Sequence, residues 1–281
     1  MSLVLGLGAP ALAAGLVAVL VTVAIERWGG RVGGVLGTMP STIVPAAVGI
    51  WSQSASVDDF IAAMAVTPVG MWVDVMFLWS WRVLPGWVGG DGGTTTLVRV
   101  LVSSIALWSA AALSVVMLLG WARASGVPLP PIGIAALLLS VVFGVIACRS
   151  NPPTPGGSRP VRGRTLVARG TLAGLAIGVS VLFARVGGPL LAGVAAVFPA
   201  IFITTMVSLW WSQGRAVQAG AVGPMMLGAS SVSAYALFAG VLLPMLGGVT
   251  GSVVAWLAAL VVVTLPSWAW LSARARRQRP S

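Results

Sequence analysis

Long apolar stretches, separated by short polar or Gly/Pro-rich stretches, run through the whole chain. A helix needs about 20 apolar residues to cross the hydrocarbon core of a bilayer. Nine stretches are long enough, and they cover residues 3–25, 32–51, 60–84, 97–121, 128–147, 166–184, 188–211, 217–245 and 249–272. The pattern therefore predicts an all-α fold, namely a polytopic transmembrane helical bundle with about nine spans.

One sequence pattern occurs twice, first between Arg27 and Gln53 and again between Arg185 and Gln213. Equivalent residues lie 158 to 160 positions apart: Gly29 and Gly187, Gly30 and Gly188, Gly34 and Gly193, Pro40 and Pro199, Pro85 and Pro244, and the two Trp-Ser-Gln triplets. Matches this regular indicate an internal duplication. Paired Gly/Pro-interrupted segments in the two halves of a membrane protein point to a binding site where the repeats meet.

The duplication and the span count together predict how the chain is organised. Residues 1–121 form a first membrane repeat, 122–165 a linker helix with a cytoplasmic Pro/Gly/Arg loop, 166–272 a second membrane repeat, and 273–281 a basic cytoplasmic tail. Each repeat has four helices, so an odd number of spans separates equivalent residues and the second repeat is inverted. Inverted repeats recur in transporters, and we expect Pro40 and Pro199 to approach each other near the bilayer midplane.

The composition supports a membrane protein and excludes several other classes. Apolar residues make up 58% of the 281 residues, charged residues 7%, and the mean hydropathy is +1.02, so the expected partner is the lipid bilayer. The net charge of +11 does not indicate nucleic acid, because the arginines lie at the ends of apolar stretches and in short polar clusters. Without His and with Cys148 as the single cysteine, we expect no metal site and no cofactor. A homodimer is compatible with the sequence.

The distribution of arginine predicts the orientation, because cytoplasmic flanks of membrane helices carry an excess of basic residues. With the N-terminus outside, 14 of the 16 basic residues lie on the inner side, and only Arg123 and Arg185 lie outside. Re-entrant Gly/Pro segments would leave seven spans that divide the arginines almost evenly, so nine spans are favoured. We expect a multi-pass protein of the bacterial plasma membrane with a cytoplasmic C-terminus and no cleaved signal peptide.

The second repeat resembles a family of small bacterial inner-membrane proteins of about four helices and unknown function, which share an Ala-Gly-x4-Phe-Pro helix. The matching residues are Ala192, Gly193, Phe198, Pro199, Gly214, Met226, Gly228, Ser231, Tyr235, Leu243 and Pro244. In the first repeat Met39 stands where the family has Phe. The resemblance implies a helical membrane fold and no known activity. The four-one-four plan is also similar to that of fluoride exporters with duplicated halves, although their motifs are absent from this chain.

Asp74 is the only acidic residue predicted well inside a span. A carboxylate there costs about 2.5–3.5 kcal/mol on insertion scales, so it should face the bundle interior or a water-filled cavity. One interpretation is an ion-pathway residue that exchanges a proton. The other is a structural, protonated Asp that is hydrogen-bonded to a neighbouring Ser or Thr.

Prolines and hydroxyl residues complete the candidate substrate or ion pathway: Pro40, Ser41, Thr42, Pro199, Thr204, Thr205, Ser231, Ser233 and Tyr235. A proline frees a backbone carbonyl, and nearby hydroxyls either satisfy the backbone or face a ligand, so packed kinks are the alternative. Ser233 aligns with Asp74 at the offset of 159 that the prolines share. We expect the repeated glycines to serve helix packing: Gly29, Gly30, Gly34, Gly187, Gly188 and Gly193.

These residues lead to two functional hypotheses. The first is an integral membrane transporter or channel-like permease for a small solute or ion, with proton coupling left open. The alternative is a non-transporting membrane subunit that organises an envelope assembly. We expect no enzyme, because the spans hold no pair of carboxylates and no Ser-Lys or Cys-His arrangement. A polar cavity that reaches Asp74 favours transport, whereas a dry interface with an exposed groove favours the assembly role.

Overall fold

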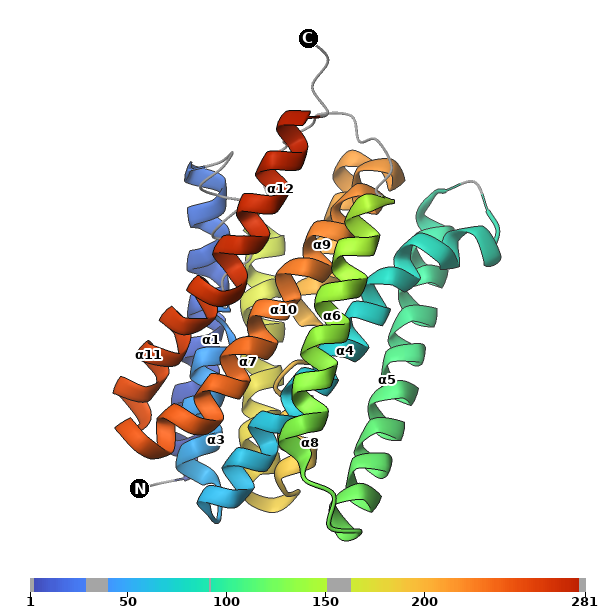
Figure 1. Cartoon of the computed structure of the whole chain (residues 1–281). Coiled ribbons are helices and arrows are strands. Elements are labelled where there is room, and N and C mark those ends of the chain that lie inside the picture. The colour runs from blue at the N-terminus through green and yellow to red at the C-terminus, as the bar shows by residue number, and fades with distance from the viewer. Residues whose placement is uncertain (1–2, 29–39, 91, 151–162, 278–281) are drawn as a thin grey trace.

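A computed structural model describes residues 3–28, 40–90, 92–150 and 163–277, and every regular element in these ranges is a helix (Figure 1). The elements are α1 (Leu3–Trp28), α3 (Ile43–Gln53), α4 (Val57–Trp87), α5 (Thr94–Ala124), α6 (Leu129–Arg149), α7 (Gly163–Val186), α8 (Pro189–Ala195), α9 (Ala200–Gln213), α10 (Arg215–Leu246), α11 (Gly248–Ala259), the π-helical segment η1 (Leu260–Thr264) and α12 (Leu265–Arg277). The predicted all-α polytopic bundle is confirmed.

Seven helical stretches are long and apolar enough to cross a membrane. They comprise α4, α5, α6, α7, α10, the pair α8 and α9, and the continuous run from α11 to α12. Two shorter apolar helices, Gly8–Leu20 within α1 and Ile43–Gln53, occupy the two remaining predicted stretches. The first half of the predicted stretch 32–51 lies largely outside the described residues. The chain is an integral membrane protein.

The centre of the bundle is formed by α4 and α10, which pack side by side and run in opposite directions (Figure 1). Small residues allow this close approach, since a Cβ atom at Gly240 of α10 would lie 3.2 Å from the Cβ atom of Met64 on α4. α6 packs against both central helices. There, a Cβ atom at Gly144 would lie 2.7 Å from the Cα atom of Leu227 on α10. Glycines at these contacts therefore set the spacing of the core helices.

A second close pair, α1 and α7, packs beside this centre. A Cβ atom at Gly15 would lie 2.7 Å from the carbonyl oxygen of Gly170 on α7. α3 packs against both helices of this pair. The pairs α4 with α10 and α1 with α7 each join stretches that the predicted repeat aligns.

The predicted helix over residues 188–211 is interrupted in its middle. α8 ends at Ala195 and α9 begins at Ala200, with a turn over Ala196–Phe198 and with Pro199 directly before α9. Pro199 has no N–H to continue the helical hydrogen bonds, and the Ala200 N–H donates instead to the Phe198 carbonyl at 2.7 Å. In the first half, Pro40 lies directly before the turn that leads into α3. Pro199 therefore marks a break between two helices, and Pro40 precedes α3 by a two-residue turn.

Figure 1 shows that α4, α6 and α12 end, and α5, α7 and α10 begin, at the same end of the bundle. In the sequence, these parts of the helices hold Arg82, Arg99, Arg149, Arg164, Arg215, Arg274 and Arg276. Arg123 and Arg185 lie at the opposite end, at the C-termini of α5 and α7. The Nη2 atom of Arg123 lies 3.0 Å from the Oδ1 atom of Asp59 in the first turn of α4. The two ends of the bundle thus differ in positive charge as the sequence predicts.

Candidate functional site

Asp74 lies near the middle of α4 and is 1% exposed. Its Oδ1 atom accepts a hydrogen bond of 2.6 Å from the indole Nε1–H of Trp108, which lies near the middle of α5. The donor is therefore an indole and not a Ser or Thr hydroxyl, which corrects the expected structural partner. An indole N–H can serve a carboxylate as well as a carboxylic acid, so this contact does not require a protonated Asp74.

The α4 backbone around Asp74 is held by contacts at both ends of the helix. The Ser56 hydroxyl caps the N-terminus by accepting from the Asp59 N–H at 3.1 Å. Thr67 precedes Pro68, and its hydroxyl donates to the Ala63 carbonyl at 2.9 Å. Toward the other end, Arg82 donates to carbonyl oxygens of α10 and α6 at 3.0 Å each. These contacts fix the helix that presents Asp74 to α5.

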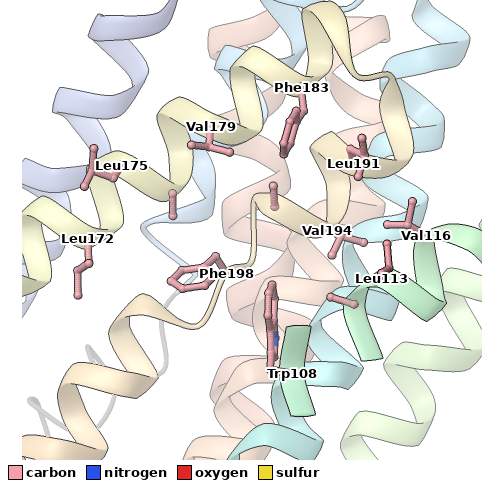
Figure 2. A pocket seen from close by; sticks show the side chains of 13 residues that line it. Trp108, Leu113, Val116, Leu172, Leu175, Val179, Phe183, Leu191, Val194 and Phe198 are labelled. Atoms are coloured by element: carbon pink, nitrogen blue, oxygen red, sulfur yellow. The ribbon is translucent and has the colours of Figure 1, made fainter. Parts of the chain in front are cut away.

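Trp108 also lines a cavity of about 450 Å³ between α5, α7 and α8. The Trp108 ring also packs edge-on against Phe198 in the break before α9, with ring centroids 5.2 Å apart. Figure 2 shows these two rings together, with Leu172, Leu175 and Val179 along α7. Trp108 thus separates the buried carboxyl group from the cavity.

The lining of this cavity is apolar. Its residues are Trp108, Ala112, Leu113, Val116, Leu172, Leu175, Ala176, Val179, Phe183, Leu191, Val194, Ala195 and Phe198. Leu113 on α5 and Leu175 on α7 are each 61% exposed. The cavity is therefore a groove that opens sideways between α5 and α7, where a membrane-spanning bundle faces hydrocarbon.

The hydroxyl residues of the predicted pathway have several different surroundings. Thr204 is buried and donates to the carbonyls of Ala200 and Ile201 in its own helix, at 3.0 Å each. Ser231 likewise donates to the Gly228 carbonyl at 2.8 Å. Tyr235 donates to the Ser252 hydroxyl at 3.3 Å and so joins α10 to α11. Ser233 is fully buried, and its hydroxyl has no hydrogen-bond partner among the described residues. Thr205 is half-buried on α9.

The predicted residues around the helix breaks and the predicted glycines also have distinct positions. Pro40 and Pro199 are buried, while Ser41 and Thr42 are half-buried in the turn before α3. Gly193 has the expected packing role, because a Cβ atom there would collide with the Ala63 carbonyl oxygen of α4. Gly188 instead has a φ of 83° at the start of α8, a left-handed conformation that favours glycine. Gly187 lies in the same turn, and Gly29, Gly30 and Gly34 fall outside the described residues.

Several buried polar side chains were not among the predicted site residues, and Trp108, Thr67 and Gln218 make the contacts that matter here. Trp108 is the partner of Asp74, and its position in the middle of a span, away from the membrane interface, was the available signal. The Thr67 hydroxyl lies 3.4 Å from the Gly193 carbonyl and so connects α4 with α8. Gln218 is fully buried near the start of α10, with its Nε2 atom 3.0 Å from the Met206 sulfur. No sequence pattern marks Thr67 or Gln218.

The acid and thiol groups do not cluster. Across the described residues no group of three His, Cys, Asp or Glu side chains could hold a metal ion. In comparisons with known proteins, no family model, no curated protein and no solved structure matches the chain. The resemblance to small four-helix membrane proteins stays a prediction from the Ala192–Pro199 pattern.

Proposed function

We propose that the protein is a permease for a small solute or ion, in which Asp74 exchanges a proton during transport. The observation that carries the proposal is the hydrogen bond between Asp74 and Trp108, placed in mid-span beside the break between α8 and α9. An acid in the membrane interior is costly and is a functional candidate by default. Discontinuous helices near the midplane are also where secondary transporters bind their substrates.

Trp108 gives this site a way to change state. Its indole holds Asp74 on one side and contacts Phe198 in the helix break on the other. A movement of the break that shifts Phe198 would also shift the indole and release the carboxyl group. Asp74 could then exchange a proton with one side of the membrane. One charge moved through the whole field is worth about 2.3 kcal/mol per 100 mV, which is enough to drive accumulation.

The inverted relation of the two halves belongs to this proposal. It is supported by the antiparallel packing of α4 against α10, which begin at Val57 and Arg215, 158 residues apart. It is also supported by the pairing of α1 with α7. Pseudo-symmetric halves of this kind can exchange conformations around a central site. We further propose a bacterial plasma-membrane location, with the arginine-rich end cytoplasmic and the N-terminus outside.

The second candidate function is a non-transporting subunit of an envelope assembly. Two observations favour it: Asp74 is closed off from solvent, and the groove beside it is apolar and open to the side. In that case Asp74 and Trp108 are a structural pair and the broken helix is a packing device. The two functions differ in whether Asp74 ever exchanges its proton with water.

Proton exchange can be measured after reconstitution of the protein into liposomes that contain the pH-sensitive dye pyranine. A pH gradient is imposed, and a panel of monovalent inorganic ions, organic cations and organic anions is added in turn. We expect at least one class to move protons through the wild-type protein. Asp74→Asn keeps the shape of the side chain and removes the titration, so it should abolish this movement.

The matched control is Asp58→Asn, which removes an exposed acid in the first turn of the same helix. It should leave proton movement unchanged. Folding is checked by gel filtration and circular dichroism. Two results contradict the permease and support the assembly subunit. One is proton movement that persists in folded Asp74→Asn protein, and the other is that no solute class makes the wild-type protein move protons.

A further inference from the structure

We propose that the groove between α5, α7 and α8 binds one acyl chain of an anionic phospholipid, with the headgroup next to Arg185. The groove is defined by the thirteen residues that line the cavity of about 450 Å³. This inference does not depend on the proposed transport, because an ordered lipid could occupy the groove in either candidate function.

The chemistry of the lining selects a hydrocarbon. The only side-chain polar atom among the lining residues is the indole nitrogen of Trp108, and this N–H is already donated to Asp74. A polar solute in the groove would lose its hydrogen bonds to water and gain none, which costs several kcal/mol on transfer scales. A hydrocarbon chain has no hydrogen bonds to lose.

The groove follows one face of α7, where Leu172, Leu175, Val179 and Phe183 form a row (Figure 2). An acyl chain is thin and flexible, and it can follow this row between α5 and α7.

Charge at the end of α7 selects an anionic headgroup. Arg185 lies in the last turn of α7, two residues after Phe183 and on a different face of the helix; it is exposed and has no ion pair among the described residues. Arg123, at the same end of the bundle, is already bound to Asp59 at 3.0 Å. A long arginine side chain can reach the headgroup level from a helix end. The free charge and the apolar groove together fit an amphiphile with a negative head and a hydrocarbon tail.

The inner end of the groove gives an occupant a point of contact with the buried acid. Trp108 and Phe198 line this end, and the Trp108 indole donates to Asp74. A chain that fills the groove therefore packs against the ring that holds the carboxyl group.

The test uses the full-length protein in nanodiscs made of equal amounts of phosphatidylglycerol and phosphatidylcholine. In one arm a trace of the phosphatidylglycerol carries a diazirine in an acyl chain, and in the other arm a trace of the phosphatidylcholine does. After illumination, mass spectrometry maps the adducts to peptides. We expect phosphatidylglycerol adducts to concentrate on 113–116 of α5 and 172–183 of α7.

Two variants fill the groove from different positions of α7, Ala176→Trp and Val179→Trp, and either should reduce these adducts several-fold. The control Ala135→Trp lies on the exposed face of α6 outside the groove and should leave them unchanged. Arg185→Gln should lower the preference for phosphatidylglycerol by about fivefold, from roughly 1 kcal/mol per arginine near a membrane surface. Arg215→Gln, at the opposite end of the bundle, should not change the preference.

Three results overturn the proposal. The first is an even spread of adducts over the exposed faces of α5, α6 and α7 in the wild type. The second is equal labelling of the groove by both phospholipids. The third is a change of oligomeric state, seen by native mass spectrometry, when Ala176→Trp or Val179→Trp fills the groove. This change would assign the groove to a second copy of the chain.

Discussion

α4 and α10 pack against each other at the centre of the bundle, but the residues near their middles have different surroundings. Asp74 on α4 has a dedicated donor, the Trp108 indole at 2.6 Å. Ser233 on α10, 159 residues later, is fully buried, and its hydroxyl has no hydrogen-bond partner in the part of the chain that the structure describes. Of two positions that the sequence repeat aligns, one thus holds an acid with a donor and the other a hydroxyl without one.

The largest expected effect comes from placing an acid in the half that lacks a donor for it. Ser233→Asp should destabilise the protein by about 2.5–3.5 kcal/mol, the cost of an acid at a helix centre. Ser233→Ala should change stability little, because no hydrogen bond is lost. Thermal unfolding in detergent, followed by circular dichroism, compares both with the wild type. An equally stable Ser233→Asp protein would mean that α10 offers an acid the same support as α4.

A smaller effect is expected when Asp74 in the first half loses its donor, the Trp108 indole. Trp108→Phe keeps an aromatic ring next to Phe198 and leaves Asp74 without its indole donor. An unsatisfied buried group costs about 1–3 kcal/mol, and the same unfolding measurement should detect this loss. The control Trp121→Phe changes an exposed tryptophan on the same helix and should stay close to the wild type. Trp108→Phe and Asp74→Asn should also be non-additive, since the two residues form one contact.

A comparable or smaller effect tests whether the two halves pack alike. Gly193→Ala should cost about 1–3 kcal/mol, because the added methyl group presses α8 against the Ala63 carbonyl of α4. If the repeat extends to packing, Gly34→Ala should be equally destabilising. Gly86 has open space around it, so Gly86→Ala should be neutral or stabilising. If Gly193→Ala lowers the thermal stability and Gly34→Ala does not, the two halves share a sequence pattern but not its packing.

The sequence was sufficient for the fold class and for the place of the break between α8 and α9. Apolar stretches of the required length predict each of the described membrane-crossing helices, Pro199 lies directly before α9, and Pro40 lies before the turn that leads into α3. These features are local, because the length of an apolar stretch and the N–H that a proline lacks each act within one segment of the chain.

The surroundings of the site could not be predicted in the same way. Asp74 stands out by its cost in the membrane, but its partner Trp108 comes from a different helix and depends on how α4 and α5 are rotated against each other. Thr204 and Ser231 are predicted pathway residues, and the structure adds that the hydroxyls of both donate to carbonyls one turn earlier in their own helices. Composition does not distinguish a hydroxyl that faces a ligand from one that satisfies the backbone.

The inverted relation of the halves is the central claim, and it can be tested at two equivalent positions. Asp58 and Ala216 lie 158 residues apart, are both exposed, and occupy the first turns of α4 and α10. Each is replaced by Cys in a Cys148→Ser background, and a membrane-impermeant maleimide is added to intact cells and to inverted vesicles. We expect Asp58→Cys to be labelled in intact cells and Ala216→Cys only in inverted vesicles. Labelling of both positions from the same side would contradict the inverted relation of the two halves.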